Sequence, residues 1–254
     1  MPLVFEEMNS FGFVHHRALN SREKYDSELV TIDARPDLTH VFEGDICWNV
    51  TSGRDDFYFR HPTLLWDTLS EDQIDEAREA GQLFLLDDLI EIADPRLRFI
   101  IELKVGKGDV GEAMRRLAVR LQDGLKDRYW IDGFSTRLMR LVKSADSGVP
   151  TSIHTKGVYG SRVCRTAPEF FPLSFPRLRS LHCVDVITAT YKTSSARYFR
   201  RFGATIDGTF RAVREAGKTL VLGGVTSPEY FELARNSMAR AAYAKFSLSE
   251  LPTS

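Results

Sequence analysis

Residues 98–134 read RFIIELKVGKGDVGEAMRRLAVRLQDGLKDRYWIDGF and predict a strand, a helix and a second strand in direct succession. The apolar runs at 98–105 and 128–134 are typical of buried strands. Between them, apolar residues recur at the spacing of an amphipathic helix: Val110, Met114, Leu117, Leu121 and Leu125. Strands joined by a helix usually pair in parallel through a right-handed crossover. This stretch therefore predicts one β–α–β unit.

The same alternation runs through the rest of the chain. Eight segments have the composition of strands: residues 11–16, 40–46, 98–105, 128–134, 151–155, 184–191, 218–224 and 241–247. Ser227 and Pro228 predict another helix start, because Ser caps a helix N-terminus and Pro fits its first turn. Eight such units close a (β/α)8 TIM barrel, and 254 residues match the usual size of one. We predict a single TIM-barrel domain over residues 1–254.

Ionisable residues lie at the carboxyl ends of the first three predicted strands, where barrel enzymes carry their chemistry. Side chains alternate faces along a strand, so Glu43 and Asp45 share one face, as do Glu102 and Lys104. Three carboxylates converging from neighbouring strands suit a hard cation such as Mg²⁺ or Ca²⁺. We predict a metal site of Glu43, Asp45 and Glu102, with a buried ion pair between Glu102 and Lys104 as the purely structural alternative.

The link between the second and third predicted strands, residues 47–97, is long enough to form an insertion at the same end of the barrel. It contains a predicted hairpin, a helix near residues 70–80, and a lone histidine, His61, in the sequence YFRHP. An insertion at the carboxyl end of the strands can bring His61 toward the carboxylates.

The order of these groups resembles the glycerophosphodiester phosphodiesterase family, whose pattern runs His-Arg, Glu-x-Asp, a second His and Glu-x-Lys. The matching residues are His16-Arg17, Glu43-Gly44-Asp45, His61 and Glu102-Leu103-Lys104, with further similarity at Thr51, Gly53 and FYFRHPTL (57–64). The resemblance implies a metal-dependent phosphodiesterase of lipid metabolism that uses His16 and His61 as catalytic acid and base. It also implies that Arg17 and Lys104 bind the substrate phosphate. Which histidine is the acid stays open.

The chain departs from that family pattern in ways that bear on the substrate. Ala18 stands where the family has Gly, Pro62 stands where it has Asp, and the usual Pro-Glu-Asn-Thr segment and seventh-strand Trp are absent. The related sphingomyelinase D-like phospholipases also lack Asp after the second His. We expect a glycerol- or sugar-linked phosphodiester as substrate. Two alternatives remain: a lipid headgroup, which the aromatic stretch 169–176 would contact, or a phosphate ligand bound without turnover.

The other histidines are assigned by their places on the strands. His15 and His16 face opposite ways, so at most one of them enters the site, and the resemblance selects His16. His154 ends the fifth strand and is a candidate for contact with substrate. His40 and His182 lie at the opposite ends of their strands and are interpreted as structural.

Composition excludes several classes of partner. With 34 basic and 35 acidic residues, the chain lacks the excess positive charge that nucleic-acid binding needs, and the Arg-rich run 197–214 fits a solvated helix face. The three cysteines have no metal-ligand spacing. No segment approaches the roughly 20 apolar residues of a membrane span, and the first residues do not resemble a signal peptide. We therefore expect a cytoplasmic protein whose partner is a small-molecule phosphodiester.

Overall fold

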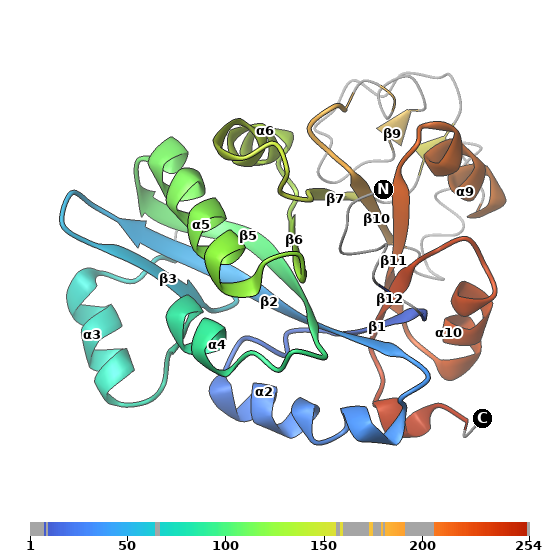
Figure 1. Ribbon diagram of the computed structural model, residues 1–254, viewed down its shortest axis with the longest axis horizontal. Coiled ribbons are helices and arrows are strands. Elements are labelled where there is room, and N and C mark those ends of the chain that lie inside the picture. Colours follow the sequence, from blue (N-terminus) through green and yellow to red (C-terminus); the bar gives the residue numbers. More distant parts are fainter. Residues whose placement is uncertain are drawn as a thin grey trace.

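The computed structural model describes residues 8, 10–63, 67–155, 158–159, 173–174, 179, 181–190 and 206–252. Eight parallel strands follow one another around the core (Figure 1): β1 (Gly12–His15), β2 (Thr39–Val50), β5 (Arg98–Gly108), β6 (Tyr129–Asp132), β7 (Ser152–Thr155), β10 (Val186–Thr190), β11 (Thr219–Val225) and β12 (Ala241–Ala244). Seven neighbouring pairs form parallel ladders, including β12 with β1. Between β6 and β7, a single bridge joins Ile131 to Thr151. The predicted TIM-barrel fold class is confirmed.

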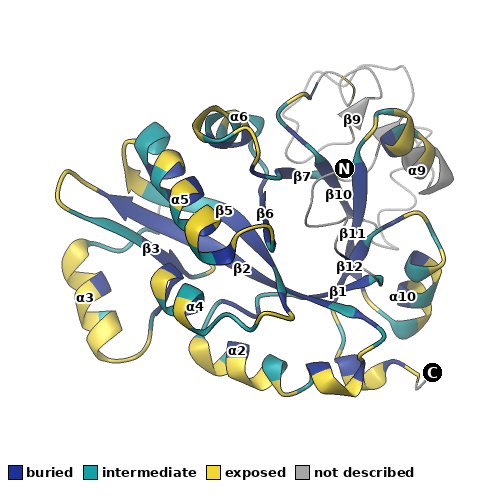
Figure 2. Cartoon of the chain, viewed as in Figure 1, coloured by how far each residue is buried: buried dark blue, intermediate teal, exposed yellow. Residues whose placement is uncertain are grey.

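Helices lie outside this ring of strands, with their exposed faces turned to solvent (Figure 2). They are α2 (Arg22–Leu29), the 3₁₀ turn η1 (Ile32–Ala34), α3 (Glu71–Glu79), α4 (Leu86–Ile92), α5 (Val110–Leu125), α6 (Thr136–Ala145), α9 (Ile206–Glu215), α10 (Pro228–Arg235) and the 3₁₀ turn η3 (Leu248–Glu250). Helix α5 buries Met114, Leu117, Leu121 and Leu125, so the predicted apolar stripe is confirmed. Helix α10 begins as predicted, with Ser227 accepting a hydrogen bond from the Tyr230 amide.

The insertion between β2 and β5 is built on an antiparallel ribbon. Strand β3 (Asp55–Phe59) pairs with the end of β2, and the short β4 (Phe84–Leu85) pairs with β3. This ribbon projects from one side of the barrel and carries α3 (Figure 1). Strand β2 continues to Val50, past the predicted insertion start at residue 47, because β3 pairs with its last residues on one side and β5 pairs with them on the other. A separate pair of short parallel strands, β8 (Val158–Tyr159) and β9 (Leu173–Ser174), completes the described strands.

Two apolar cores lie on opposite faces of the strands. The larger one fills the space between strands and helices and includes Phe42, Phe99 and Ile101. The smaller one fills the barrel interior with Val14, Val41, Ile100, Trp130, Val186, Val221 and Ala241. Two residues further along the same strands, the inward positions change from apolar to polar at Glu43, Glu102 and Asp132. The interior thus consists of an apolar layer below and a polar layer at the carboxyl ends.

Two buried histidines, His15 and His40, lie outside the barrel interior and connect the first two strands to α2. Nδ1 of His15 lies 2.8 Å from Oε2 of Glu28, and Nε2 of His15 lies 3.0 Å from Nδ1 of His40. His40 in turn donates from Nε2 to the Arg35 carbonyl at 3.1 Å. These side-chain contacts link β1, β2 and α2, in agreement with the structural interpretation of His40.

We expect His40→Gln to reduce the acid sensitivity of the fold. Burial, and then the charge of His15, lower the pKa of His40 from 6.5 to about 4. As pH falls below 6.5, the unfolded chain takes up this proton first, so the folded state loses up to about 3 kcal/mol by pH 4. Urea unfolding between pH 4 and 6.5 should give a shallower pH dependence in the variant. If the pH dependence of the unfolding free energy is the same in the variant and the wild type, other groups cause the acid sensitivity.

Some predicted features lie outside the described residues. These are the Arg-rich run up to residue 205, the aromatic stretch 169–176 apart from 173–174, and Cys164. Across the residues that are described, no helix is both long and apolar enough to cross a membrane.

Candidate active site

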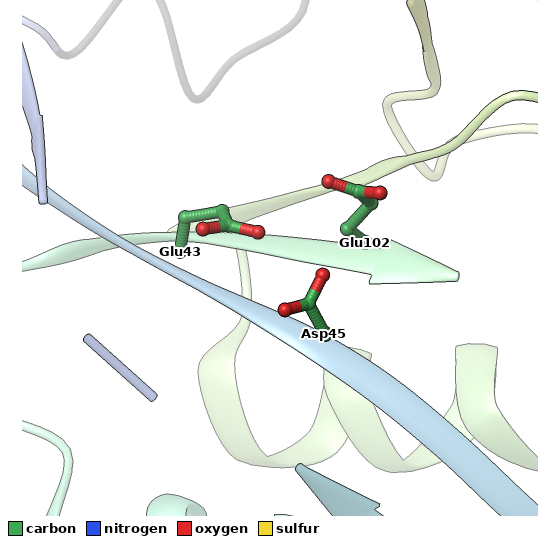
Figure 3. Close-up of side chains that lie close together, drawn as sticks. All are labelled: Glu43, Asp45 and Glu102. Atoms are coloured by element: carbon green, nitrogen blue, oxygen red, sulfur yellow. The ribbon is translucent and has the colours of Figure 1, made fainter. Parts of the chain in front are cut away.

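Three carboxylates meet inside the barrel at the carboxyl ends of β2 and β5. One oxygen from each of Glu43, Asp45 and Glu102 lies within 4.8 Å of the others, and all three side chains are buried. Figure 3 shows the carboxylates of the two neighbouring strands turned toward one another. The parallel register, which pairs Asp45 with Glu102, brings together residues that are 57 positions apart (102 − 45).

The cluster holds more negative charge than its neighbours balance. Nζ of Lys104 lies 2.7 Å from Oδ1 of Asp45 and also contacts Oε1 of Glu102. Burial, then the charges of Asp45 and Glu102, raise the pKa of Glu43 well above its usual range. Burial also raises the pKa of Glu102, although His154 and Lys104 act in the opposite direction. Lys104 and the partly exposed Arg17 are two cations beside three buried carboxylates, so the cluster favours a further cation.

The loop after β1 fixes the two carboxylates of β2. The Arg17 amide donates to Oε2 of Glu43 at 2.6 Å. The Asn20 side chain donates to Oδ2 of Asp45 at 2.7 Å and accepts from the Asp45 amide at 2.9 Å. Asp45 keeps a lowered pKa because Lys104 and Asn20 outweigh the effect of its burial. The loop therefore holds both carboxylates in one orientation.

Arg17 has a left-handed backbone, with φ of 61°. Its side chain is 41% exposed, and Nε lies 3.5 Å from Oδ2 of Asp45. The next residue, Ala18, does not have a positive φ. Its backbone conformation therefore does not require glycine, and alanine fits where the resembled family has Gly.

Gly44 permits the close approach of the loop and the insertion to β2. A Cβ at Gly44 would lie 2.5 Å from Cβ of Leu19 and 2.8 Å from Cδ1 of Phe59. We expect Gly44→Ala to destabilise the protein by about 1–3 kcal/mol, because both neighbours are fully packed. Gly53→Ala is the matched control, since a Cβ there meets nothing within 4 Å. Equal midpoints of thermal unfolding for the two variants would contradict the packing argument.

His16 and His61 approach the cluster from different elements. The half-buried His16 follows β1, and its ring centroid lies 6.2 Å from that of Tyr243. Burial, then the charge of Arg17, lower the pKa of His16 from 6.5 to about 4. His61 is exposed and follows β3 directly after Arg60, whose amide donates to the Asp45 carbonyl at 2.8 Å. The charge of His61 is one of the influences that lower the pKa of Asp45.

The donor set fits a hard divalent cation. Oε1 of Glu43 is buried and, within the part of the chain that the structure describes, has no hydrogen-bond partner. Such an unsatisfied carboxylate oxygen is costly unless a cation or a donor faces it. The three side chains offer only oxygen ligands, which Mg²⁺ and Ca²⁺ prefer. The residues present therefore suit the predicted metal.

The sequence prediction omitted two polar residues beside the cluster, Asn20 and Asp132. Asn20 lies in a loop without any periodic pattern, so no sequence signal marked it. Asp132 ends β6 next to Glu102 in the parallel register, and His154 lies 2.7 Å from it. The rule that selected Glu102, a carboxylate at the carboxyl end of a strand, applies equally to Asp132.

Comparison with known proteins supplies the fold relationship. No family model matches the chain, and no curated protein matches its sequence. A glycerophosphodiester phosphodiesterase from Parabacteroides distasonis matches in structure with a TM-score of 0.60 at 13% identity, over 93% of this chain and 93% of its own. The chain has the fold of the glycerophosphodiester phosphodiesterases.

Two further structures of this fold agree. A glycerophosphodiester phosphodiesterase from Agrobacterium tumefaciens has a TM-score of 0.58 at 14% identity, over 92% of this chain and 96% of its own. A phosphodiesterase from Oleispira antarctica, in complex with the product sn-glycerol-3-phosphate, has a TM-score of 0.59 at 12% identity, over 95% of this chain and 94% of its own. At such identities the likeness establishes the fold, and the reaction must be inferred from the side chains.

Proposed function

We propose that the protein is a phosphoric diester hydrolase that cleaves a small phosphodiester by metal-dependent acid/base catalysis. The observation that carries this proposal is the set of three buried carboxylates, with their oxygens within 4.8 Å, beside His16 and Lys104. The shared fold with glycerophosphodiester phosphodiesterases and the matching order of motifs support the same reaction.

The divalent cation, Mg²⁺ or Ca²⁺, would be held by Glu43, Asp45 and Glu102. When bound, such a cation neutralises phosphate charge and acts as a Lewis acid. Arg17 and Lys104 supply further positive charge for the non-bridging oxygens, Arg17 through its planar guanidinium and Lys104 as a point charge. Arg17 is the more exposed of the two, at 41% against 15%, and therefore the easier for a substrate to reach.

The two histidines divide the proton transfers. His16 has its pKa lowered to about 4, so its imidazole is neutral at neutral pH and accepts the proton of the attacking hydroxyl. An anionic phosphate beside His16 raises its pKa, which strengthens it as a base once substrate is bound. His61, exposed on the insertion, donates the proton to the leaving alkoxide.

The substrate we propose is a glycerol- or sugar-linked phosphodiester. The Oleispira antarctica phosphodiesterase of the same fold was captured with sn-glycerol-3-phosphate, a small phosphomonoester product. A small polar substrate also suits the buried carboxylates and hydroxyls at the carboxyl ends of the strands, among them Glu43, Asp132 and Thr188.

A panel of glycerol-, sugar- and lysolipid-linked diesters, each with Mg²⁺, Ca²⁺ or EDTA, tests the proposal. We expect metal-dependent product from a glycerol or sugar diester. Product from the lysolipid diester alone, together with co-sedimentation with vesicles, would move the substrate to lipid headgroups. Binding of the diesters without product from any of them would identify a phosphate-binding barrel instead.

A further inference from the structure

A network of buried polar side chains lies beside the carboxylate cluster, on strands that the proposed mechanism does not use. Its centre is Asp132 on β6, which is fully buried. Oδ2 of Asp132 accepts hydrogen bonds from the Tyr243 hydroxyl on β12 at 2.9 Å and from the Thr188 hydroxyl on β10 at 3.4 Å. Strand β12 lies across the ring from β6, and only β7 separates β10 from β6, so the network crosses the barrel interior and fixes Asp132 from more than one side.

His154 on β7 joins this network to the metal site. Its Nε2 lies 2.7 Å from Oδ2 of Asp132 and 3.7 Å from Oε2 of Glu102. The imidazole stacks on Phe134 with ring centroids 4.6 Å apart and an interplanar angle of 22°. Its side chain is only 12% exposed. The ring is therefore held by the contact of one nitrogen with Asp132 and by packing of one face against Phe134.

The direction of the imidazole argues against the direct substrate contact expected from sequence. Nε2 faces two carboxylates, one of which is a predicted metal ligand. The other oxygen of Glu102, Oε1, contacts Lys104. Each oxygen of Glu102 thus has its own nitrogen neighbour, and Nε2 of His154 is the one on the side facing Asp132.

We propose that His154 is a positioning residue of the metal site, which Asp132 anchors and which in turn fixes the Glu102 carboxylate for cation binding. This inference rests on the proposed metal-dependent function and deepens it. Neighbours that orient a ligating carboxylate commonly contribute about 10- to 100-fold to metal affinity. Asp132 acts through His154, and Tyr243 acts through Asp132.

Isothermal titration of the full-length protein with Mg²⁺ and with Ca²⁺, without any diester, tests this arrangement. We expect His154→Leu to raise the Kd about 10- to 100-fold. His154→Gln keeps an N–H donor at a similar reach and should recover part of that loss. Asp132→Asn should also weaken binding. The double variant Asp132→Asn/His154→Leu should bind no more weakly than His154→Leu alone, because both changes interrupt one path.

His40→Gln is the matched control, since it makes the same change at a buried histidine outside the barrel interior. It should leave both Kd values unchanged. If His154→Leu does not fold, His154→Gln and Tyr243→Phe carry the test, and each should raise the Kd above that of the wild type. Wild-type-like Kd values in the folded His154 variants would overturn the positioning role and leave the proposed function intact. A wild-type protein that binds neither cation would overturn both.

Discussion

Replacing His16 by alanine should lower kcat for phosphodiester cleavage by about 10²- to 10⁴-fold, the usual contribution of a general acid or base. His16 is half-buried next to Arg17, whose amide holds Glu43, so it lies where an attacking hydroxyl near the cluster would lose its proton. His61→Ala should cause a loss of the same order. Neither change removes an interaction that the fold depends on, and both variants should unfold at nearly the wild-type temperature.

The control for this experiment is His182→Ala, because His182 is an exposed histidine away from the site. It should retain wild-type kcat. The pH profile adds a second check: kcat/KM reports the free enzyme, in which the pKa of His16 is lowered to about 4. The decline of kcat/KM on the acid side of the profile should therefore lie below pH 6.5. In His16→Ala this decline should no longer follow the pKa of His16. Near wild-type turnover in that variant would remove His16 from the mechanism.

Replacing Glu43 by glutamine should abolish metal binding without destabilising the metal-free protein. The glutamine oxygen can still accept the Arg17 amide, which donates to Glu43 at 2.6 Å. Burial and the neighbouring charges of Asp45 and Glu102 raise the pKa of Glu43 well above its usual range, so the metal-free site favours the neutral form of this side chain, which glutamine matches. In our proposal, however, the carboxylate of Glu43 is one of the three that hold the cation.

We expect the metal-induced increase in unfolding temperature to disappear in Glu43→Gln, while the metal-free unfolding temperature stays equal to or above that of the wild type. Glu79→Gln makes the same change at an exposed position on α3 and should preserve the metal effect. An undiminished metal effect in Glu43→Gln would place the cation elsewhere. A large loss of metal-free stability would mean that Glu43 is ionised and paired in the fold.

The alternation of apolar and polar residues along the strands was sufficient to predict the fold and the carboxylate cluster. The strand–helix–strand pattern of residues 98–134 corresponds to β5, α5 and β6 within a few residues. Glu43, Asp45 and Glu102 converge because period-two alternation places Glu43 and Asp45 on one face of β2, and the parallel register with β5 pairs Asp45 with Glu102. Strand β2 is longer than predicted, since its last residues pair with both β3 and the extended end of β5.

Contacts across the barrel could not be predicted in the same way. The hydrogen bond from Tyr243 to Asp132 joins residues 111 positions apart on strands that are not neighbours. It depends on the width of the barrel and on side-chain length, neither of which the alternation pattern contains. The clamp of Asn20 on Asp45 depends on the path of a loop after β1. His154 was identified by its strand end, but only the direction of its ring suggested a role beside Glu102.

Phosphorus NMR of a glycerophosphodiester incubated with the purified protein tests the central proposal most directly. With Mg²⁺ or Ca²⁺, we predict that the diester signal is replaced by a phosphomonoester or cyclic phosphate signal, and that EDTA or His16→Ala suppresses this change. A folded wild-type protein that binds the cation and the diester but leaves the diester signal intact would contradict the account.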